Sequence, residues 1–194
     1  MSAQSARYST VAIILHWLIS LLIIGQLLGG LIMTRFLPKA SALTFEIYQL
    51  HKSFGITVLL LSVLRLLWRL GHRPPELPAD MANWERVSAR ITHILFYVLI
   101  LLIPLSGWAM VSSSPLNIPT YLFDVIKLPH LPFWEDATNK AAITSRFATI
   151  HEYMGFFTIA LLALHVGAAL KHHFVNKDSV LTRMLPIVRP RSAR

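Results

Sequence analysis

Four histidines lie within or at the edges of long apolar stretches of the chain, where an imidazole ring is unusual. They are His16, His51, His151 and His165. An unpaired polar ring inside lipid is costly, so an intramembrane histidine is a candidate functional residue by default. A neutral imidazole is also the commonest protein ligand for metal ions. The residue type and its position therefore predict metal chemistry inside a membrane.

The spacing of two of these histidines is informative. His151 and His165 belong to one apolar stretch and are fourteen residues apart. In an α-helix this spacing brings the side chain back to within about 40° of its starting direction and about 21 Å further along the axis. One helix therefore presents two imidazoles on one face, one near each surface of a membrane. This arrangement predicts two stacked metal centres.

The elements that must position these residues are membrane helices. The chain has 194 residues, of which 55% are hydrophobic and only 14% charged, which is typical of one membrane domain over residues 1–194. Its formal net charge of +9 comes from basic residues that flank apolar runs, so we expect no nucleic-acid partner. The absence of cysteine excludes thiolate ligands, iron–sulfur clusters and covalent haem attachment.

The predicted fold is an all-α, integral membrane four-helix bundle. Hydropathy places its transmembrane helices at about residues 8–34, 48–68, 91–111 and 147–171. The segment 69–90 is rich in proline and charge and is expected to be a loop, as is the long segment 112–146. Pro104 is expected to kink the third helix.

The orientation follows from the positions of lysine and arginine. With the N-terminus inside, twelve of these residues lie on the inner side and six on the outer side. The positive-inside rule then predicts that both termini and the loop 69–90 are cytoplasmic, and that the loop 112–146 is periplasmic.

This topology sorts the histidines by depth. His16 and His165 lie near the inner surface, whereas His51 and His151 lie near the outer surface. Each pair could clamp one haem iron from both sides, which would give two b-type centres with bis-imidazole ligation.

Small neighbours support this interpretation. The residue four positions after a ligand shares its helix face, and a flat macrocycle needs room there. After the four histidines these residues are all small: Ser20, Gly55, Gly155 and Ala169. After His93 the same position is Tyr97, so we expect His93 to be a packing or interfacial residue.

Other assignments stay open at this point. The four histidines could instead form hydrogen bonds across helices. Zinc is the other metal to consider, but two imidazoles per site would leave a tetrahedral zinc ion under-ligated. Lys52 and Arg146, at the outer surface, are candidate partners of haem propionates, or else snorkelling residues at helix ends. The same two alternatives apply to Arg69 and Lys171 near the inner surface. We expect His172 and His173 to be interfacial, and the loop residues His72 and His130 to be solvated.

Four segments make the chain similar to the bacterial cytochrome b561 family. They are residues 14–18, 50–56, 63–70 and 165–186, and the last of them includes the pairs His172-His173 and Lys177-Asp178. The resemblance implies a bacterial inner-membrane bundle with two non-covalent b haems, ligated by the residues that match His16, His51, His151 and His165. It also implies electron exchange with the quinone pool, with ubiquinone as acceptor. Some members of the family are superoxide:ubiquinone oxidoreductases.

We therefore expect an oxidoreductase that relays electrons across the inner membrane between a periplasmic donor and a quinone. If the donor is superoxide, cations at the outer surface would raise its local concentration. These cations are Lys52, Lys127, Lys140 and Arg146. The alternatives are a haem-bearing membrane anchor that passes electrons for a separate periplasmic protein, and a non-redox scaffold. Membrane lipid is a partner in every case, and a homodimer is compatible with each.

Overall fold

Four long helices make up most of the protein in a computed structural model, which describes residues 7–38, 41–78 and 81–185. Each of them is long and apolar enough to cross a membrane. The prediction of an all-α, four-helix membrane fold is confirmed. The helices are α1 (Thr10–Arg35), α2 (Ala42–Gly71), α3 (Asn83–Ser112) and α4 (Lys140–Lys171).

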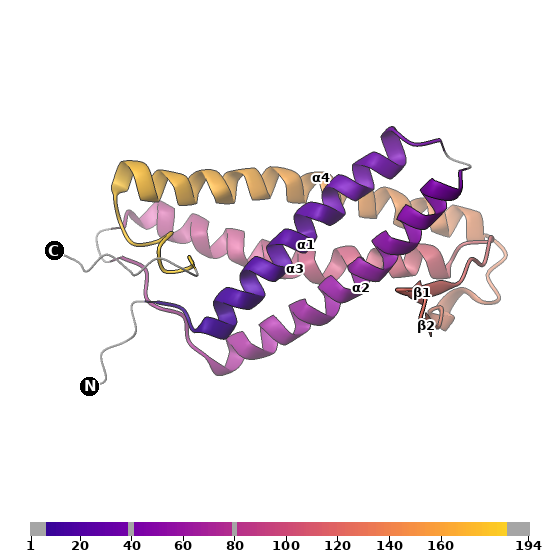
Figure 1. The fold of residues 1–194 in the computed structure, drawn as a ribbon, viewed down its shortest axis with the longest axis horizontal. Helices are drawn as coiled ribbons and strands as arrows, with labels where there is room; N and C mark the ends of the chain where they lie inside the picture. Colours follow the sequence, from indigo (N-terminus) through magenta and orange to yellow (C-terminus); the bar gives the residue numbers. More distant parts are fainter. Residues whose placement is uncertain (1–6, 39–40, 79–80, 186–194) are drawn as a thin grey trace.

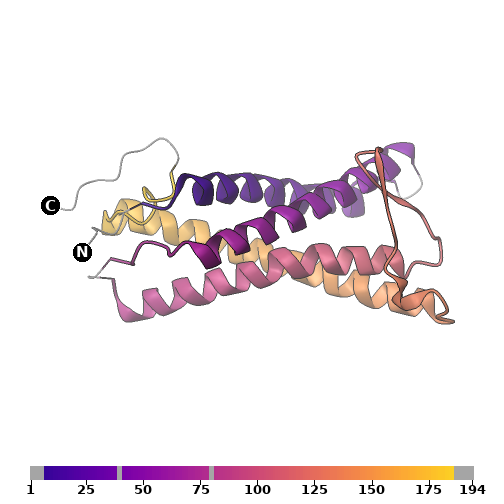
Figure 2. The same cartoon turned by 90° about the horizontal axis from the view of Figure 1, so that it is seen from below.

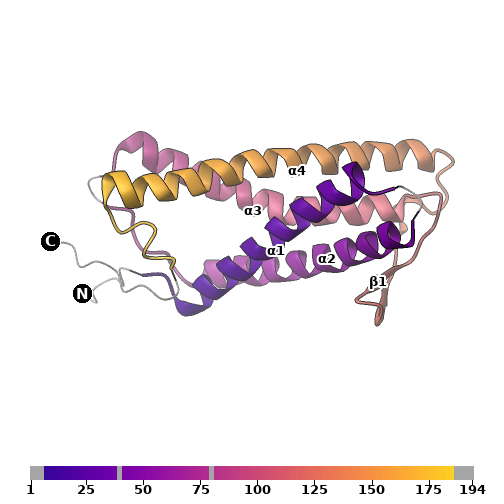
Figure 3. The same ribbon diagram turned by 45° about the horizontal axis from the view of Figure 1, so that its top comes forward.

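The helices run lengthwise through an elongated bundle (Figure 1). α1 packs against α2, α2 against α3, and α3 against α4, whereas α4 has few close backbone approaches to α1 or α2. Figure 2 shows the α1–α2 pair and the α3–α4 pair as two layers, and Figure 3 shows that α1 is inclined to α4. A β-hairpin marks one end of the bundle, which we call the hairpin end. At the other end of the bundle α1 and α3 begin, and α2 and α4 finish. We call this the opposite end.

Serine side chains start the first two helices. Ser9 accepts a hydrogen bond from the Ala12 N–H, and Ser41 accepts one from the Thr44 N–H, so each hydroxyl satisfies an N–H group that has no partner within its helix.

The interior of the bundle is lined by small residues. The most deeply buried side chains are serines and threonines, while many leucines, isoleucines and phenylalanines on the helices are exposed. Small residues allow helix backbones to approach closely in a membrane, and the exposed apolar side chains are the surface that meets lipid. The buried set comprises Thr44, Ser53, Ser62, Ser113 and Thr158.

Three helices begin earlier than the predicted membrane spans. α2 starts at Ala42, α3 at Asn83 and α4 at Lys140, so helical turns occupy parts of the segments 69–90 and 112–146 that were expected to be loops. Hydropathy marks only the apolar part of a helix, whereas the backbone hydrogen bonds of the helix continue into the polar interface of the membrane. α3 passes through Pro104 without interruption.

The segment between α3 and α4 is ordered. It contains an antiparallel hairpin of β1 (Thr120–Leu122) and β2 (Ile126–Leu128), followed by a 3₁₀ turn η1 (Pro132–Trp134). Phe123, Asp124 and Val125 connect the strands, and the first two have φ angles of 49° and 59°. Two successive residues with positive φ make the tight turn that matches the twist of paired strands.

Candidate functional site

Near the hairpin end, α2 and α4 bring together two of the predicted histidines. The ring centroids of His51 and His151 are 6.2 Å apart and their planes are inclined by 76°. Both rings are half-buried. We call this the outer pair.

The hydrogen bonds of His151 determine its tautomer. Its Nδ1 lies 3.0 Å from the Ile103 carbonyl oxygen and 3.0 Å from Ser106 Oγ. A carbonyl oxygen only accepts, so Nδ1 carries the hydrogen and Nε2 keeps a free lone pair. Metal-binding histidines are oriented in this way, with the second ring nitrogen donating to a backbone carbonyl.

Two glycines make room for the outer pair. A Cβ atom on Gly107 of α3 would lie 3.2 Å from His151 Cε1, and one on Gly30 of α1 would lie 3.6 Å from His51 Cε1. The first distance is shorter than ordinary van der Waals contact, so a side chain at Gly107 would push the ring. Neither glycine was predicted as a site residue, because its closeness to a histidine depends on how two helices cross.

His51 contains a polar atom without a partner. Its Nδ1 is buried and has no hydrogen bond, while its backbone carbonyl accepts one from Gln26 Nε2 at 2.8 Å. An unsatisfied buried nitrogen costs about 1–3 kcal/mol. A site that gives the ring a bonding partner would offset this cost, so the orphaned nitrogen fits a residue that binds a metal group.

The β-hairpin is attached to α2 beside the outer pair. Ser53 Oγ accepts a hydrogen bond from the Phe123 N–H and lies 3.0 Å from the Tyr121 carbonyl oxygen. Lys52 Nζ donates to the Pro119 carbonyl oxygen at 3.0 Å. The residues immediately after His51 therefore hold the hairpin in place.

Arg146, the other cation predicted for this site, lies on an exposed part of α4. No hydrogen bond or ion pair joins it to the described residues, and none joins Lys52 to either histidine. The structure thus gives Lys52 a structural contact with the hairpin and leaves Arg146 at the surface.

A second pair lies near the opposite end. The ring centroids of His16 on α1 and His165 on α4 are 6.3 Å apart, with planes inclined by 74°. We call this the inner pair. His93 of α3, expected to be a packing residue, has its ring centroid 5.7 Å from that of His165, and Phe96 is 5.3 Å from the same ring. The structure therefore places a third imidazole beside the inner pair.

Both separations suit two imidazoles on opposite sides of one metal ion. With metal–nitrogen bonds of about 2 Å, the ring centroids of such ligands lie slightly more than about 6 Å apart. A direct hydrogen bond between two imidazoles would bring the centroids to about 5 Å. Each pair joins α4 to a helix, α1 or α2, whose backbone it approaches closely at few places. Among the described residues, no group of three or more His, Cys, Asp or Glu side chains could hold a metal ion.

Comparison with known proteins identifies the family. Residues 7–186 match the family model of prokaryotic cytochrome b561. The chain belongs to this family. It is 31% identical to "Cytochrome b561 homolog 1" of Escherichia coli (strain K12), over 93% of this chain and 97% of that protein. It is 28% identical to "Cytochrome b561 homolog 2" of the same strain, over 92% of this chain and 91% of that protein. It is also 27% identical to "Probable superoxide oxidase CybB" of Yersinia pestis, over 93% of this chain and 96% of that protein.

Membership in the cytochrome b561 family, together with four helices that can span a membrane, makes the chain a multi-pass protein of the bacterial inner membrane. The family implies b-type haem and a role in membrane electron transport. The predictions of family, location and electron transport are confirmed.

The remaining histidines of this cytochrome b561 have other contacts. His172, expected to be interfacial, is buried in a π-helical turn after α4, with Nδ1 2.5 Å from Asp178 Oδ2. His173 is half-buried beside Phe174. In the loops, His72 stacks on Trp68, and His130 Nε2 lies 3.3 Å from a backbone carbonyl oxygen.

Proposed function

We propose that the chain is a di-haem b-type cytochrome that relays electrons across the inner membrane between a periplasmic donor and the quinone pool. The observation that carries this proposal is the duplicated geometry on α4. His151 and His165 each face a histidine from another helix, at centroid separations of 6.2 and 6.3 Å. A pair of facing histidines near each end of a membrane bundle is the arrangement that a transmembrane relay requires.

The residues that would hold the haems are the two histidine pairs. The outer pair, His51 and His151, would bind one haem b, and the inner pair, His16 and His165, would bind the other. Bound haem b supplies a reversible one-electron couple. The chain's own contribution is to present Nε2 of His151 with its lone pair free, because Nδ1 donates to Ile103.

We also propose the orientation that the basic residues indicate, with both termini in the cytoplasm. The opposite end of the bundle is then cytoplasmic and the hairpin end periplasmic. Arg65, Arg69 and Arg73 lie where α2 finishes, at the opposite end, in agreement with the positive-inside rule. The inner pair accordingly faces the cytoplasmic side.

Superoxide is the donor that the Yersinia pestis relative suggests by its name. Two superoxide ions would give up two electrons and leave as dioxygen, while one ubiquinone takes up two electrons and two protons to become ubiquinol. The cations proposed to attract superoxide stand at the hairpin end. Lys127 lies on β2, Lys140 begins α4, Arg146 is exposed on α4, and Lys52 donates to the Pro119 carbonyl oxygen.

A second candidate function is a haem-bearing anchor that takes electrons from a separate periplasmic protein. The exposed apolar side chains of the hairpin segment favour it, because Val125 and Phe133 are 81% and 76% exposed. Single exposed apolar residues are common, but Val125 in the hairpin turn and Phe133 in η1 expose theirs on the same segment between α3 and α4, which is suited to docking. Co-purification of a defined partner that reduces the cytochrome, lost in a Val125→Ser variant, would favour this function over superoxide oxidation.

The proposal is tested by a reduced-minus-oxidised spectrum and a pyridine haemochrome count on the purified protein. We expect a b-type α band and close to two haems per chain. The His51→Ala and His165→Ala variants should each retain about one haem, whereas the control His130→Ala should retain two. A wild-type protein with a single haem, or histidine variants that keep both haems, would contradict the assignment of the pairs.

A further inference from the structure

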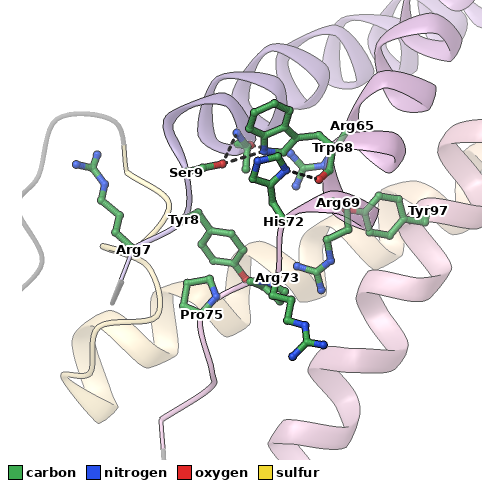
Figure 4. Close-up of a pocket in the computed structure, with 13 residues that line it drawn as sticks. Arg7, Tyr8, Ser9, Arg65, Trp68, Arg69, His72, Arg73, Pro75 and Tyr97 are labelled. Carbon is green, nitrogen blue, oxygen red and sulfur yellow. Dashed lines mark hydrogen bonds between the residues drawn. The ribbon is translucent and has the colours of Figure 1, made fainter. Parts of the chain in front are cut away.

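The opposite end of the bundle contains a cavity that is lined by none of the four paired histidines. It has a volume of about 540 Å³, within the range of small-molecule sites in proteins. Its walls come from the start of the chain before α1, the last turns of α2, the segment that follows α2, and Tyr97 of α3 (Figure 4).

The cavity is strongly cationic. Four arginines line it, and no aspartate or glutamate is found among the described residues of its wall; the four are Arg7, Arg65, Arg69 and Arg73. Like charges in one cavity repel each other, and the repulsion grows as water is excluded. Acidic side chains that could offset it are used elsewhere, since Glu85 pairs with Lys171 and Asp178 with His172.

Two of the arginines are available to a ligand. Arg69 and Arg73 make no hydrogen bond or ion pair with the described residues. Figure 4 draws both side chains among the residues that line the cavity, with no dashed line to either. Arg65, in contrast, donates through Nη1 to the Ala12 carbonyl oxygen at 2.9 Å.

The rest of the wall is held in place by specific contacts. His72 stacks on Trp68, with ring centroids 3.8 Å apart and planes inclined by 7°. Trp68 Nε1 donates to Ser9 Oγ at 2.9 Å, which ties the end of α2 to the start of α1. The cavity is therefore a built feature in which the two free guanidinium groups stand beside fixed aromatic rings.

From this arrangement we infer that the cavity binds a phosphate-bearing anion, supplied by the headgroup of an anionic phospholipid. The guanidinium fork matches phosphate oxygens in pairs, and arginine is the residue of choice for this recognition. Tryptophan and tyrosine are the aromatic residues that settle at headgroup depth. Basic pockets between membrane helices on the cytoplasmic side are suited to anionic headgroups.

The surroundings favour a lipid over a soluble phosphate. The turn of α2 that carries Arg69 also exposes Leu67 and Leu70, by 59% and 77%, and this apolar surface can accompany acyl chains. The inference uses Arg69 and Arg73 and none of the proposed haem ligands, while the choice of the inner leaflet as the source rests on the proposed orientation.

The test uses the haem-loaded, full-length protein, stripped of lipid in detergent. Native mass spectrometry would count bound phosphatidylglycerol during a titration, with phosphatidylcholine and inorganic phosphate as parallel probes. We expect one phosphatidylglycerol per chain to bind at least tenfold more tightly than phosphatidylcholine. The double variant Arg69→Gln/Arg73→Gln should lose this preference by at least tenfold.

A matched control removes two charges from the same end of the bundle but outside the cavity. In the Arg90→Gln/Lys177→Gln variant the preference should persist. If the double cavity variant fails to fold, Arg73→Gln alone serves, because Arg73 lies in an exposed segment after α2. Its loss of preference should then be at least threefold.

Three results would overturn the inference. The first is equal phosphatidylglycerol binding by wild type and the cavity variant. The second is tight binding of inorganic phosphate with no preference among lipids, which would assign the cavity to a soluble anion. The third is loss of haem from the cavity variant with lipid binding unchanged, which would assign the arginines to haem propionates. Haem stoichiometry is read separately from lipid binding, so failure here is distinct from failure of the proposed function.

Discussion

The sharpest prediction concerns Gly107, which contacts the outer pair from α3. A Cβ atom there would lie 3.2 Å from His151 Cε1 and 3.4 Å from its Nδ1. Gly107→Ala requires the ring to move by a few tenths of an ångström, and Gly107→Val adds two methyl groups in the same place. Overpacking of this kind costs about 1–3 kcal/mol. Since about 1.4 kcal/mol is a factor of ten, Gly107→Val should weaken haem binding at the outer pair roughly 5- to 150-fold.

The assay is the haem-to-protein ratio of purified variants, followed by a redox titration. Gly107→Val should fall from about two haems to about one, and the remaining haem should keep the midpoint potential of the inner site. The control is Gly25→Val on α1, where an added Cβ meets nothing within 4 Å, and it should keep both haems. Two haems with unchanged potentials in Gly107→Val would refute the argument that His151 must occupy its present position.

Three further predictions follow from single contacts. His16→Ala should lose the inner haem while His93→Ala keeps it; the reverse result, read by haem count, would make His93 the partner of His165. Ser53→Ala should leave the Phe123 N–H without its acceptor, at a cost of about 1–3 kcal/mol, and should speed hydrogen exchange in residues 120–128 without changing haem content. Slow exchange in that variant would mean that the hairpin is held mainly by other contacts. Arg35→Gln breaks an ion pair with Glu152 in which both side chains are more than half exposed, so thermal stability should fall by less than about 1 kcal/mol, and a larger loss would show that the pair is coupled to the core.

The features that were predictable from the sequence are those that repeat along a helix. The fourteen-residue spacing of His151 and His165 depends only on helix geometry, and apolar length alone locates four spanning helices. The histidines were grouped into pairs by their expected depth in the membrane, and this required no knowledge of how the helices cross.

The features that could not be predicted arise where different segments meet. Gly30 and Gly107 approach histidine rings only because of the crossing positions of α1 with α2 and of α3 with α4. The acceptor for His151 is a backbone carbonyl, at Ile103, and sequence carries no signal for it. Gly107, a glycine in an apolar span three residues after Pro104, was the one available hint of a close approach.

The hairpin and His93 illustrate two other limits. β1 and β2 have three residues each, too few to show alternation, and the positive-φ positions of their turn are Phe123 and Asp124, where glycine or asparagine is more usual. His93 was set aside because Tyr97 follows one turn later, yet its ring lies beside His165. The size of the residue four positions later describes the space on the histidine's own helix only. It carries no information on how near the side chains of another helix come.

The position of α4 in the chain has a consequence for how the protein is made. This helix supplies one histidine to each pair, and it is the last of the four to leave the ribosome and enter the membrane. Until then, α1 and α2 present His16 and His51 with no opposing ring. Both proposed cofactor sites would therefore be completed at the same step, the insertion of α4. On the proposed assignment, a chain that stops before α4 would have neither histidine pair, so insertion of this one helix would act as a single checkpoint for both haem sites.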